Sequence, residues 1–204
     1  MFERVYHNFS LLLNMYLWPL QQWWNRLDDY IILGAIPLVE YHLPLLIEKE
    51  NIKAILCLTE SHELDVSMMG TPVTKQIALT HYMEHCHVPI KDWNATHTQE
   101  LLRASNFIHR CVLNQKQIYV HCRVGKGRSV LALACYYIQY HHMSVEEAFD
   151  YIRYHRPIIQ PSSKQIQAAG EFYSFIYSFQ NVTSIDCKDN HDEFYDQKCC
   201  ESYL

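Results

Sequence analysis

Short apolar runs and longer amphipathic stretches alternate along the chain, and their periods predict the elements of the fold. The expected strands are residues 30–33, 52–58, 77–88 and 118–121. The expected helices are residues 38–49, 96–114 and 130–140, followed by two more that open at Ser144 and Ser162. Residues 60–75 have no clear period and are expected to form a loop. Alternating strands and helices predict an α/β domain.

Three of these helices are preceded by a hydroxyl side chain that is followed, three residues later, by Glu or Gln. This spacing is the signature of a capping box, in which two side chains satisfy backbone N–H groups at the helix start. The pairs are Thr96 with Gln99, Ser144 with Glu147 and Ser162 with Gln165.

The two ends of the chain differ from the domain between them, which is expected to span residues 23–180. Residues 1–22 form an amphipathic segment, which predicts either a helix packed on the domain or an interfacial membrane helix that makes peripheral contact with a bilayer. Residues 181–204 are acidic, polar and aperiodic, and are expected to be disordered.

Charge and cysteine usage narrow the class of protein. The chain has 204 residues, with 17 Lys and Arg against 22 Asp and Glu, a net charge of -5. This balance excludes a bulk electrostatic binder of nucleic acid, and no nucleic-acid partner is expected. The eight cysteines contain no C-x-x-C pair, which favours reduced thiols in an intracellular protein. The longest uncharged apolar run, residues 130–138, is too short for a membrane span.

The chemistry is concentrated in Ile118-Tyr119-Val120-His121-Cys122-Arg123-Val124-Gly125-Lys126-Gly127-Arg128-Ser129, which lies between an apolar strand and an apolar helix. Five residues separate Cys122 from Arg128, enough for a loop that curls so that successive N–H groups converge on one dianion. The following helix points its positive N-terminus at the same place. Arg128 can grip two phosphate oxygens with its planar fork.

The same positive field lowers the pKa of the Cys122 thiol, which predicts a thiolate nucleophile rather than an inert buried cysteine. Ser129 is expected to hydrogen-bond the sulfur and help it leave in the second step, and His121 to orient the loop. The residues expected to bind the substrate are Arg123, Val124, Gly125, Lys126 and Gly127. No cofactor and no metal are expected.

His-Cys-x5-Arg-Ser resembles the signature of the cysteine-dependent tyrosine and dual-specificity phosphatases. The resemblance implies a single tyrosine-phosphatase-like domain with a central, mainly parallel sheet flanked by helices. It also implies a general acid on a loop some thirty residues before the nucleophile, a position that Asp92 occupies. The alternative for Asp92 is a solvated loop carboxylate.

A second segment, residues 24–38, resembles the opening of the mitochondrial tyrosine-phosphatase-like enzymes that dephosphorylate phosphatidylglycerophosphate. This resemblance implies a phosphorylated lipid as substrate and a location at a mitochondrial membrane, with the cytoplasm as the alternative. Cys57 resembles the second cysteine with which some lipid phosphatases of this superfamily form a reversible disulfide. It is therefore a candidate redox partner for Cys122.

Three functions remain open: a lipid phosphomonoester phosphatase, a protein dual-specificity phosphatase acting on phosphoproteins, and a non-catalytic phosphate-binding module. The third is disfavoured because Cys122, Arg128 and Asp92 are all present. The lipid is favoured by the family resemblance and by Arg123 and Lys126, two cations expected to rim the pocket. There they would attract a second phosphate on the substrate.

Overall fold

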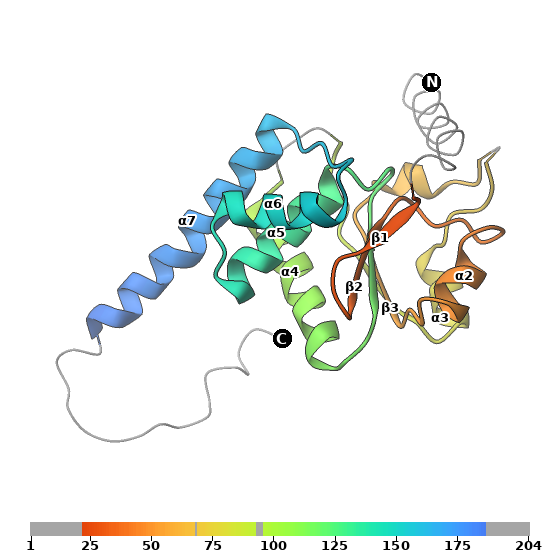
Figure 1. The fold of residues 1–204 in the computed structure, drawn as a ribbon, viewed down its shortest axis with the longest axis horizontal. Coiled ribbons are helices and arrows are strands. Elements are labelled where there is room, and N and C mark those ends of the chain that lie inside the picture. Colours follow the sequence, from red (N-terminus) through yellow and green to blue (C-terminus); the bar gives the residue numbers. More distant parts are fainter. Residues whose placement is uncertain (1–21, 68, 93–95, 187–204) are drawn as a thin grey trace.

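The computed structural model describes residues 22–67, 69–92 and 96–186. Figure 1 shows strands in the middle of the domain with helices on both sides. Along the chain the elements are β1 (Trp24–Arg26), β2 (Ile31–Gly34), α2 (Leu43–Glu48), β3 (Ala54–Cys57), η1 (Ser61–Leu64), α3 (Lys75–Thr80), β4 (Glu84–His87), α4 (Thr98–Leu113), β5 (Ile118–His121), α5 (Arg128–His141), α6 (Val145–His155) and α7 (Ser163–Asp186).

The strands form one sheet in the order β1-β2-β5-β3-β4. β1 is antiparallel to β2, and every other pair is parallel, which confirms the mainly parallel sheet. β5 is the central strand, and its last residue, His121, is in register with Gly34 of β2 and Cys57 of β3. Three parallel strands therefore end side by side where the chain enters residues 122–128, which we call the Cys122 loop.

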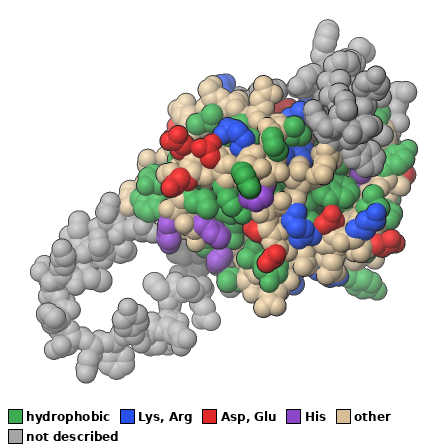
Figure 2. Space-filling model, in the orientation of Figure 1, with side chains coloured by type: hydrophobic (Ala, Val, Ile, Leu, Met, Phe, Trp, Pro, Cys, Tyr) green, Lys and Arg blue, Asp and Glu red, His purple; other side chains and the backbone are tan. Residues whose placement is uncertain are grey.

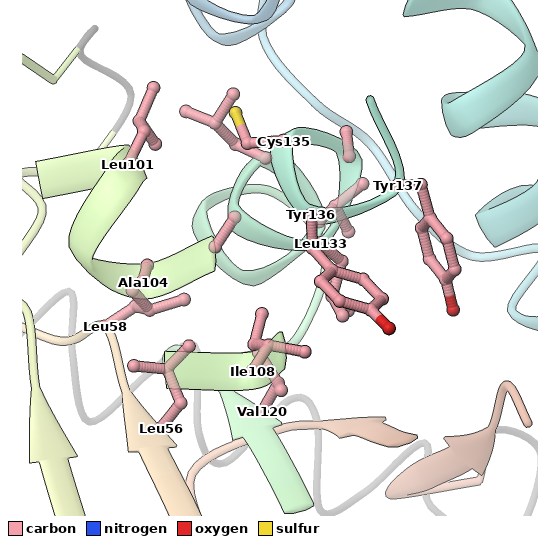
Figure 3. Packing of buried hydrophobic residues seen from close by; sticks show 14 of the residues in the cluster. Leu56, Leu58, Leu101, Ala104, Ile108, Val120, Leu133, Cys135, Tyr136 and Tyr137 are labelled. Atoms are coloured by element: carbon pink, nitrogen blue, oxygen red, sulfur yellow. The ribbon is translucent and has the colours of Figure 1, made fainter. Parts of the chain in front are cut away.

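Two apolar layers hold helices on opposite faces of the sheet. On one face α2 and α3 cover Ile32, Ile55 and Tyr119. On the other, α4 to α7 surround a larger core, in which Leu56 of β3, Leu58 just after it and Val120 of β5 meet the apolar sides of α4 and α5 (Figure 3). Eleven residues of α5 are buried, as expected for a helix that is apolar on all sides. This packing fixes the start of α5, and with it the end of the Cys122 loop.

The structure corrects one predicted element. The apparent alternation over residues 77–88 predicted a single strand, but its first part is helix α3 and only Glu84–His87 is strand β4. Thr74 opens α3, because its hydroxyl accepts a hydrogen bond from the backbone N–H of Ile77 at 3.5 Å. The hydrophobic pattern of this short segment suits a helix or a strand. The cap at Thr74 and the burial of Ala78 against α2 and the sheet decide for the helix.

The other predicted element boundaries differ less from those in the structure. The helix expected at residues 38–49 begins at Leu43, and the short strand β1 was not predicted from the sequence. Two of the three capping pairs are present as hydrogen bonds, Ser144 with Glu147 and Ser162 with Gln165. In the third, Thr96 contacts Glu100, and α4 begins at Thr98.

The predictions for the chain ends fall largely outside the described residues. The amphipathic segment overlaps the description only at Gln22, and the acidic tail only at residues 181–186, where α7 continues as a helix (Figure 1). Among the described residues, no helix combines the length and apolar character needed to cross a membrane.

Candidate active site

The Cys122 loop turns sharply between β5 and α5, and glycines make the turn possible. Gly125 has φ +69°, a conformation that side chains resist. A Cβ on Gly125 would also lie 2.5 Å from the carbonyl oxygen of Gly34, so the end of β2 packs directly on the loop. Gly127 is the N-cap of α5, where a Cβ would lie 2.8 Å from the Gln165 side-chain oxygen. Close backbone approach therefore requires glycine at position 125, whereas at position 127 the side chain of Gln165 takes up the space.

Cys122 lies at the start of this loop, 2% exposed. Its Sγ is 3.3 Å from the Ser129 hydroxyl, the contact expected from the sequence. Burial by itself raises the pKa of the Cys122 thiol, but the charge of Arg128 and hydrogen bonds from Ser129 and the Gly125 backbone outweigh it. The net shift lowers the pKa, so the surroundings favour the thiolate.

The guanidinium of Arg128 is buried and its N–H groups can be assigned one by one. Nη1 and Nη2 lie 2.5 and 3.0 Å from the two carboxylate oxygens of Glu63. Nη1 also donates to the Ile90 carbonyl at 3.1 Å. Nε makes no hydrogen bond within the described residues. The edge formed by Nε and the second hydrogen of Nη2 therefore has no hydrogen-bond partner among the described residues, and its two donors match two oxygens of a phosphate.

Asp92 reaches the same cations from the loop after β4. Its carboxylate lies 3.4 Å from Arg128 Nε and 3.2 Å from Arg123 Nη1. The side chain is 29% exposed, so it faces both the arginines and solvent. The structure therefore brings Asp92 to the Cys122 loop, at the guanidinium edge that Glu63 does not occupy.

Arg123 does not rim a pocket, contrary to the sequence-based expectation. Its side chain is 6% exposed, its Nε lies 2.6 Å from Glu63 Oε1, and its Nη1 pairs with Asp92. Two carboxylates draw the side chain inward, because a buried guanidinium needs charged or polar partners. Arg123 thus links Asp92, on the loop after β4, to the Cys122 loop.

Glu63 is the site residue that the sequence analysis missed. It lies on η1, inside the segment expected to be an irregular loop, and it is fully buried between Arg123 and Arg128. Burial alone would raise the pKa of Glu63, but the hydrogen bond and charge of Arg128 and the charge of Arg123 lower it to about 2. The available signal was Glu60 followed three residues later by Glu63, a pair that caps η1.

The remaining predicted residues occupy the loop or its support. His121 is fully buried, its Nδ1 lies 3.3 Å from the Cys122 carbonyl, and burial lowers its pKa to about 3, so the ring is neutral. Val124 and Lys126 are half-buried on the loop. The Lys126 carbonyl accepts a hydrogen bond from the Gln160 backbone at 2.8 Å, which fixes the loop against the segment before α7.

Cys57 ends β3 beside His121 in the register. It is a buried free thiol, with its sulfur 3.1 Å from the Thr59 hydroxyl, and burial raises its pKa to about 11. The register places Cys57 beside the residue that precedes Cys122, which keeps a redox pairing of the two sulfurs a prediction that can be tested.

A cysteine and an arginine at the two ends of a loop, between a central parallel strand and a buried helix, define the class of cysteine-dependent phosphatases. The family model described as dual specificity phosphatase, catalytic domain, matches residues 43–175, and the chain belongs to this family.

Known proteins of this class cover most of the chain. It is 32% identical over 163 residues to the phosphatidylglycerophosphate phosphatase PTPMT2 of Arabidopsis thaliana, a match that covers 77% of this chain and 68% of the relative. It is 27% identical over 157 residues to phosphatidylglycerophosphatase and protein-tyrosine phosphatase 1 of Rattus norvegicus, covering 76% and 79%. The crystal structure of PTPMT1 in complex with PI(5)P superposes with a TM-score of 0.71, at 24% identity, and covers 78% of this chain and 99% of that one. The expected family and fold are confirmed.

The Glu63 carboxylate should control stability at acid pH. Its pKa in the folded protein, about 2, lies below its ordinary value of 4.5. The stabilisation is therefore complete above about pH 4.5 and is lost as the pH falls towards 2, by about 3 kcal/mol. Glu63→Gln should lower the free energy of unfolding at pH 7 by about 3–5 kcal/mol, because two buried cations lose their counter-charge.

Urea unfolding between pH 2 and 7 measures both effects. The exposed Glu146, changed to Gln, is the matched control and should follow the wild-type curve. A Glu63→Gln protein that unfolds with the wild-type free energy across this pH range would contradict the role of the carboxylate.

A second expected outcome concerns oxidation. Mild peroxide should convert the Cys122 thiolate to a sulfenic acid, which the Cys57 sulfur then attacks, displacing water and forming a disulfide that thiols reverse. Peptide mapping after peroxide treatment tests this. Cys57→Ser should make inactivation irreversible, while Cys86→Ser, a change at another free cysteine, should not. If mapping finds only irreversible acids at Cys122, with Cys57 unmodified, the pairing is wrong.

Proposed function

We propose that the chain hydrolyses phosphomonoesters through a phosphocysteine intermediate, with a phospholipid headgroup as substrate. The observation that carries the catalytic part is the buried Cys122 thiol with a lowered pKa, held beside Ser129 under the charge of Arg128. A nucleophile in this setting needs no base. The edge of the Arg128 guanidinium that Glu63 does not occupy, which faces Asp92 in the structure, supplies a bidentate anchor for the phosphate.

The reaction then follows in two steps. The Cys122 sulfur attacks phosphorus, the ester P–O bond breaks, and Asp92 gives its proton to the leaving oxygen. Asp92, now a carboxylate, takes a proton from water as the water oxygen attacks phosphorus, and the S–P bond breaks to release phosphate and the thiolate. Arg128 stabilises the charge on the equatorial oxygens in both steps, and Ser129 donates to the sulfur as it leaves.

Support for a lipid substrate comes from the relatives. The Arabidopsis relative is named a phosphatidylglycerophosphate phosphatase, and the rat relative carries the same activity in its name. The sequence resemblance in residues 24–38 points to the same enzymes. A location at a mitochondrial membrane, with peripheral contact through residues 1–22, belongs to this proposal. Imaging of the tagged full chain, with and without those residues, tests it.

A second candidate is a protein dual-specificity phosphatase. The specific observations that favour it are the description of the matching family model and the protein-tyrosine phosphatase activity in the name of the rat relative. Both candidates share the two catalytic steps, so only a comparison of substrates separates them.

The mechanism predicts distinct effects for two substitutions. Cys122→Ser should abolish turnover while substrate still binds, because the hydroxyl is not ionised at neutral pH. Asp92→Asn should lower kcat by about 10²–10⁴-fold, most for poor leaving groups, and should flatten the basic limb of the pH–rate profile. Steady-state kinetics with aryl phosphates of graded leaving-group pKa measure both. Full activity in Cys122→Ser, or an unchanged pH profile in Asp92→Asn, would refute these roles.

The substrate proposal rests on the cation that remains at the loop surface. Lys126 is half-buried, and within the described residues no carboxylate pairs with it. Lys126→Ala should therefore lower kcat/KM about tenfold more for phosphatidylglycerophosphate in vesicles than for a phosphotyrosine peptide, since only the lipid carries a second phosphate nearby.

Lys116→Ala, which removes a lysine that pairs with Glu84 instead, is the matched control. Equal losses on both substrates in Lys126→Ala, or a wild-type preference for the peptide, would favour the protein-phosphatase candidate.

A further inference from the structure

A third arginine, Arg156, lies fully buried behind the Cys122 loop, at the C-terminal end of α6. Its Nε donates to the Gly125 carbonyl at 3.0 Å, and its Nη2 donates to the Val124 carbonyl at 3.4 Å. Its Nη1 donates to Asn25 Oδ1 at 2.6 Å and to the Gln22 carbonyl at 3.2 Å. One guanidinium therefore joins the loop to the start of β1.

The two loop contacts determine where backbone N–H groups point. In a trans peptide the carbonyl of one residue and the N–H of the next point in opposite directions. When Arg156 draws the Val124 carbonyl to the rear of the loop, the Gly125 N–H is directed to the front. The Gly125 N–H is the group that helps to lower the pKa of Cys122. The Gly125 carbonyl in turn directs the Lys126 N–H forward, where a bound anion would lie.

Arg156 differs from Arg123 and Arg128 in the groups that surround its positive charge. Arg123 and Arg128 are paired with Glu63 and Asp92, whereas the hydrogen-bond partners of Arg156 among the described residues are neutral oxygens. Burial lowers the pKa of Arg156, while the nearby Tyr119 and Cys122 act to raise it. The hydrogen bonds to the Val124 and Gly125 carbonyls hold its positive charge directly against the loop that begins at Cys122.

We propose that Arg156 is a positioning residue for the phosphatase reaction: it orients the Gly125 and Lys126 N–H groups through two carbonyls and adds an unpaired positive charge behind the thiolate. This inference rests on Cys122 being the nucleophile, as proposed above. It does not depend on whether the substrate is a lipid or a protein.

Two substitutions of Arg156 separate geometry from charge. Arg156→Lys keeps the charge and loses the planar fork, whereas Arg156→Met loses both. The readouts are the pH dependence of Cys122 alkylation by iodoacetamide, followed by peptide mapping, and the inhibition of turnover by inorganic phosphate. In Arg156→Met we expect alkylation below the wild-type titration midpoint to slow about tenfold, and phosphate inhibition to weaken as much. Arg156→Lys keeps the charge, so it should slow alkylation less than Arg156→Met does, but it should weaken phosphate inhibition as much, because the fork is lost.

A substitution at Asn25 tests the effect of the Arg156 charge while Arg156 itself and the residues of the Cys122 loop stay unchanged. Asn25→Asp places a carboxylate where Nη1 now meets an amide oxygen, so the guanidinium gains a counter-charge and its field at Cys122 weakens. Alkylation below the midpoint should slow several-fold, with no loss of thermal stability. Asn25→Ala removes the hydrogen bonds to Arg156 and Gln22 without adding charge and should leave the alkylation profile unchanged.

Each outcome decides one part of the proposal. If Asn25→Asp and Arg156→Met both titrate like the wild type, the charge contributes nothing to the thiolate. If folded Arg156→Lys binds phosphate like the wild type, the fork does not position the N–H groups. Failure of the proposed function looks different, because turnover would then persist in Cys122→Ser.

Discussion

The buried Glu63 carboxylate is the interaction on which the site depends. Arg123 and Arg128 are both removed from water, and an isolated charge in that setting costs several kcal/mol. One carboxylate bonds both guanidinium groups, so the helix start that carries Arg128 and the loop that carries Arg123 are fixed to η1 together. Removing Glu63 would leave two buried cations short of a counter-charge, which is why the position of a single side chain governs the whole site.

The backbone beneath these charges is held by close contacts that exclude side chains. Gly34 accommodates the Tyr119 ring, whose hydroxyl donates to the Ala35 carbonyl at 2.6 Å. The Ile36 N–H then donates to the Arg123 carbonyl at 3.1 Å. The end of β2 and the residues just after it thus support the Cys122 loop from below. The shape of the anion site therefore depends on the sheet as well as on the loop. The face shown in Figure 2 carries both acidic and basic side chains.

Local signals predicted much of the fold. The central strand at residues 118–121, the boxes that open α6 and α7 and the loop from Cys122 to Arg128 follow from short-range patterns. Helix α3 was missed because its short pattern suits helix or strand alike, and packing decides. Glu63 and the inward turn of Arg123 were missed for a different reason. Both arise from contacts across some sixty residues of sequence, which no local period encodes.

The charges gathered at the Cys122 loop bear on the phosphomonoester proposed as its substrate. Arg123, Arg128, Arg156 and Lys126 contribute four positive charges, and Glu63 and the Cys122 thiolate contribute two negative ones, which leaves +2 apart from Asp92. The phosphomonoester dianion proposed as substrate balances this charge. In the proposed reaction Asp92 gives its proton in the first step, and the carboxylate it becomes faces Arg123 and Arg128, the two cations with which it pairs in the structure. The same two arginines would therefore stabilise that carboxylate until the proposed attack by water.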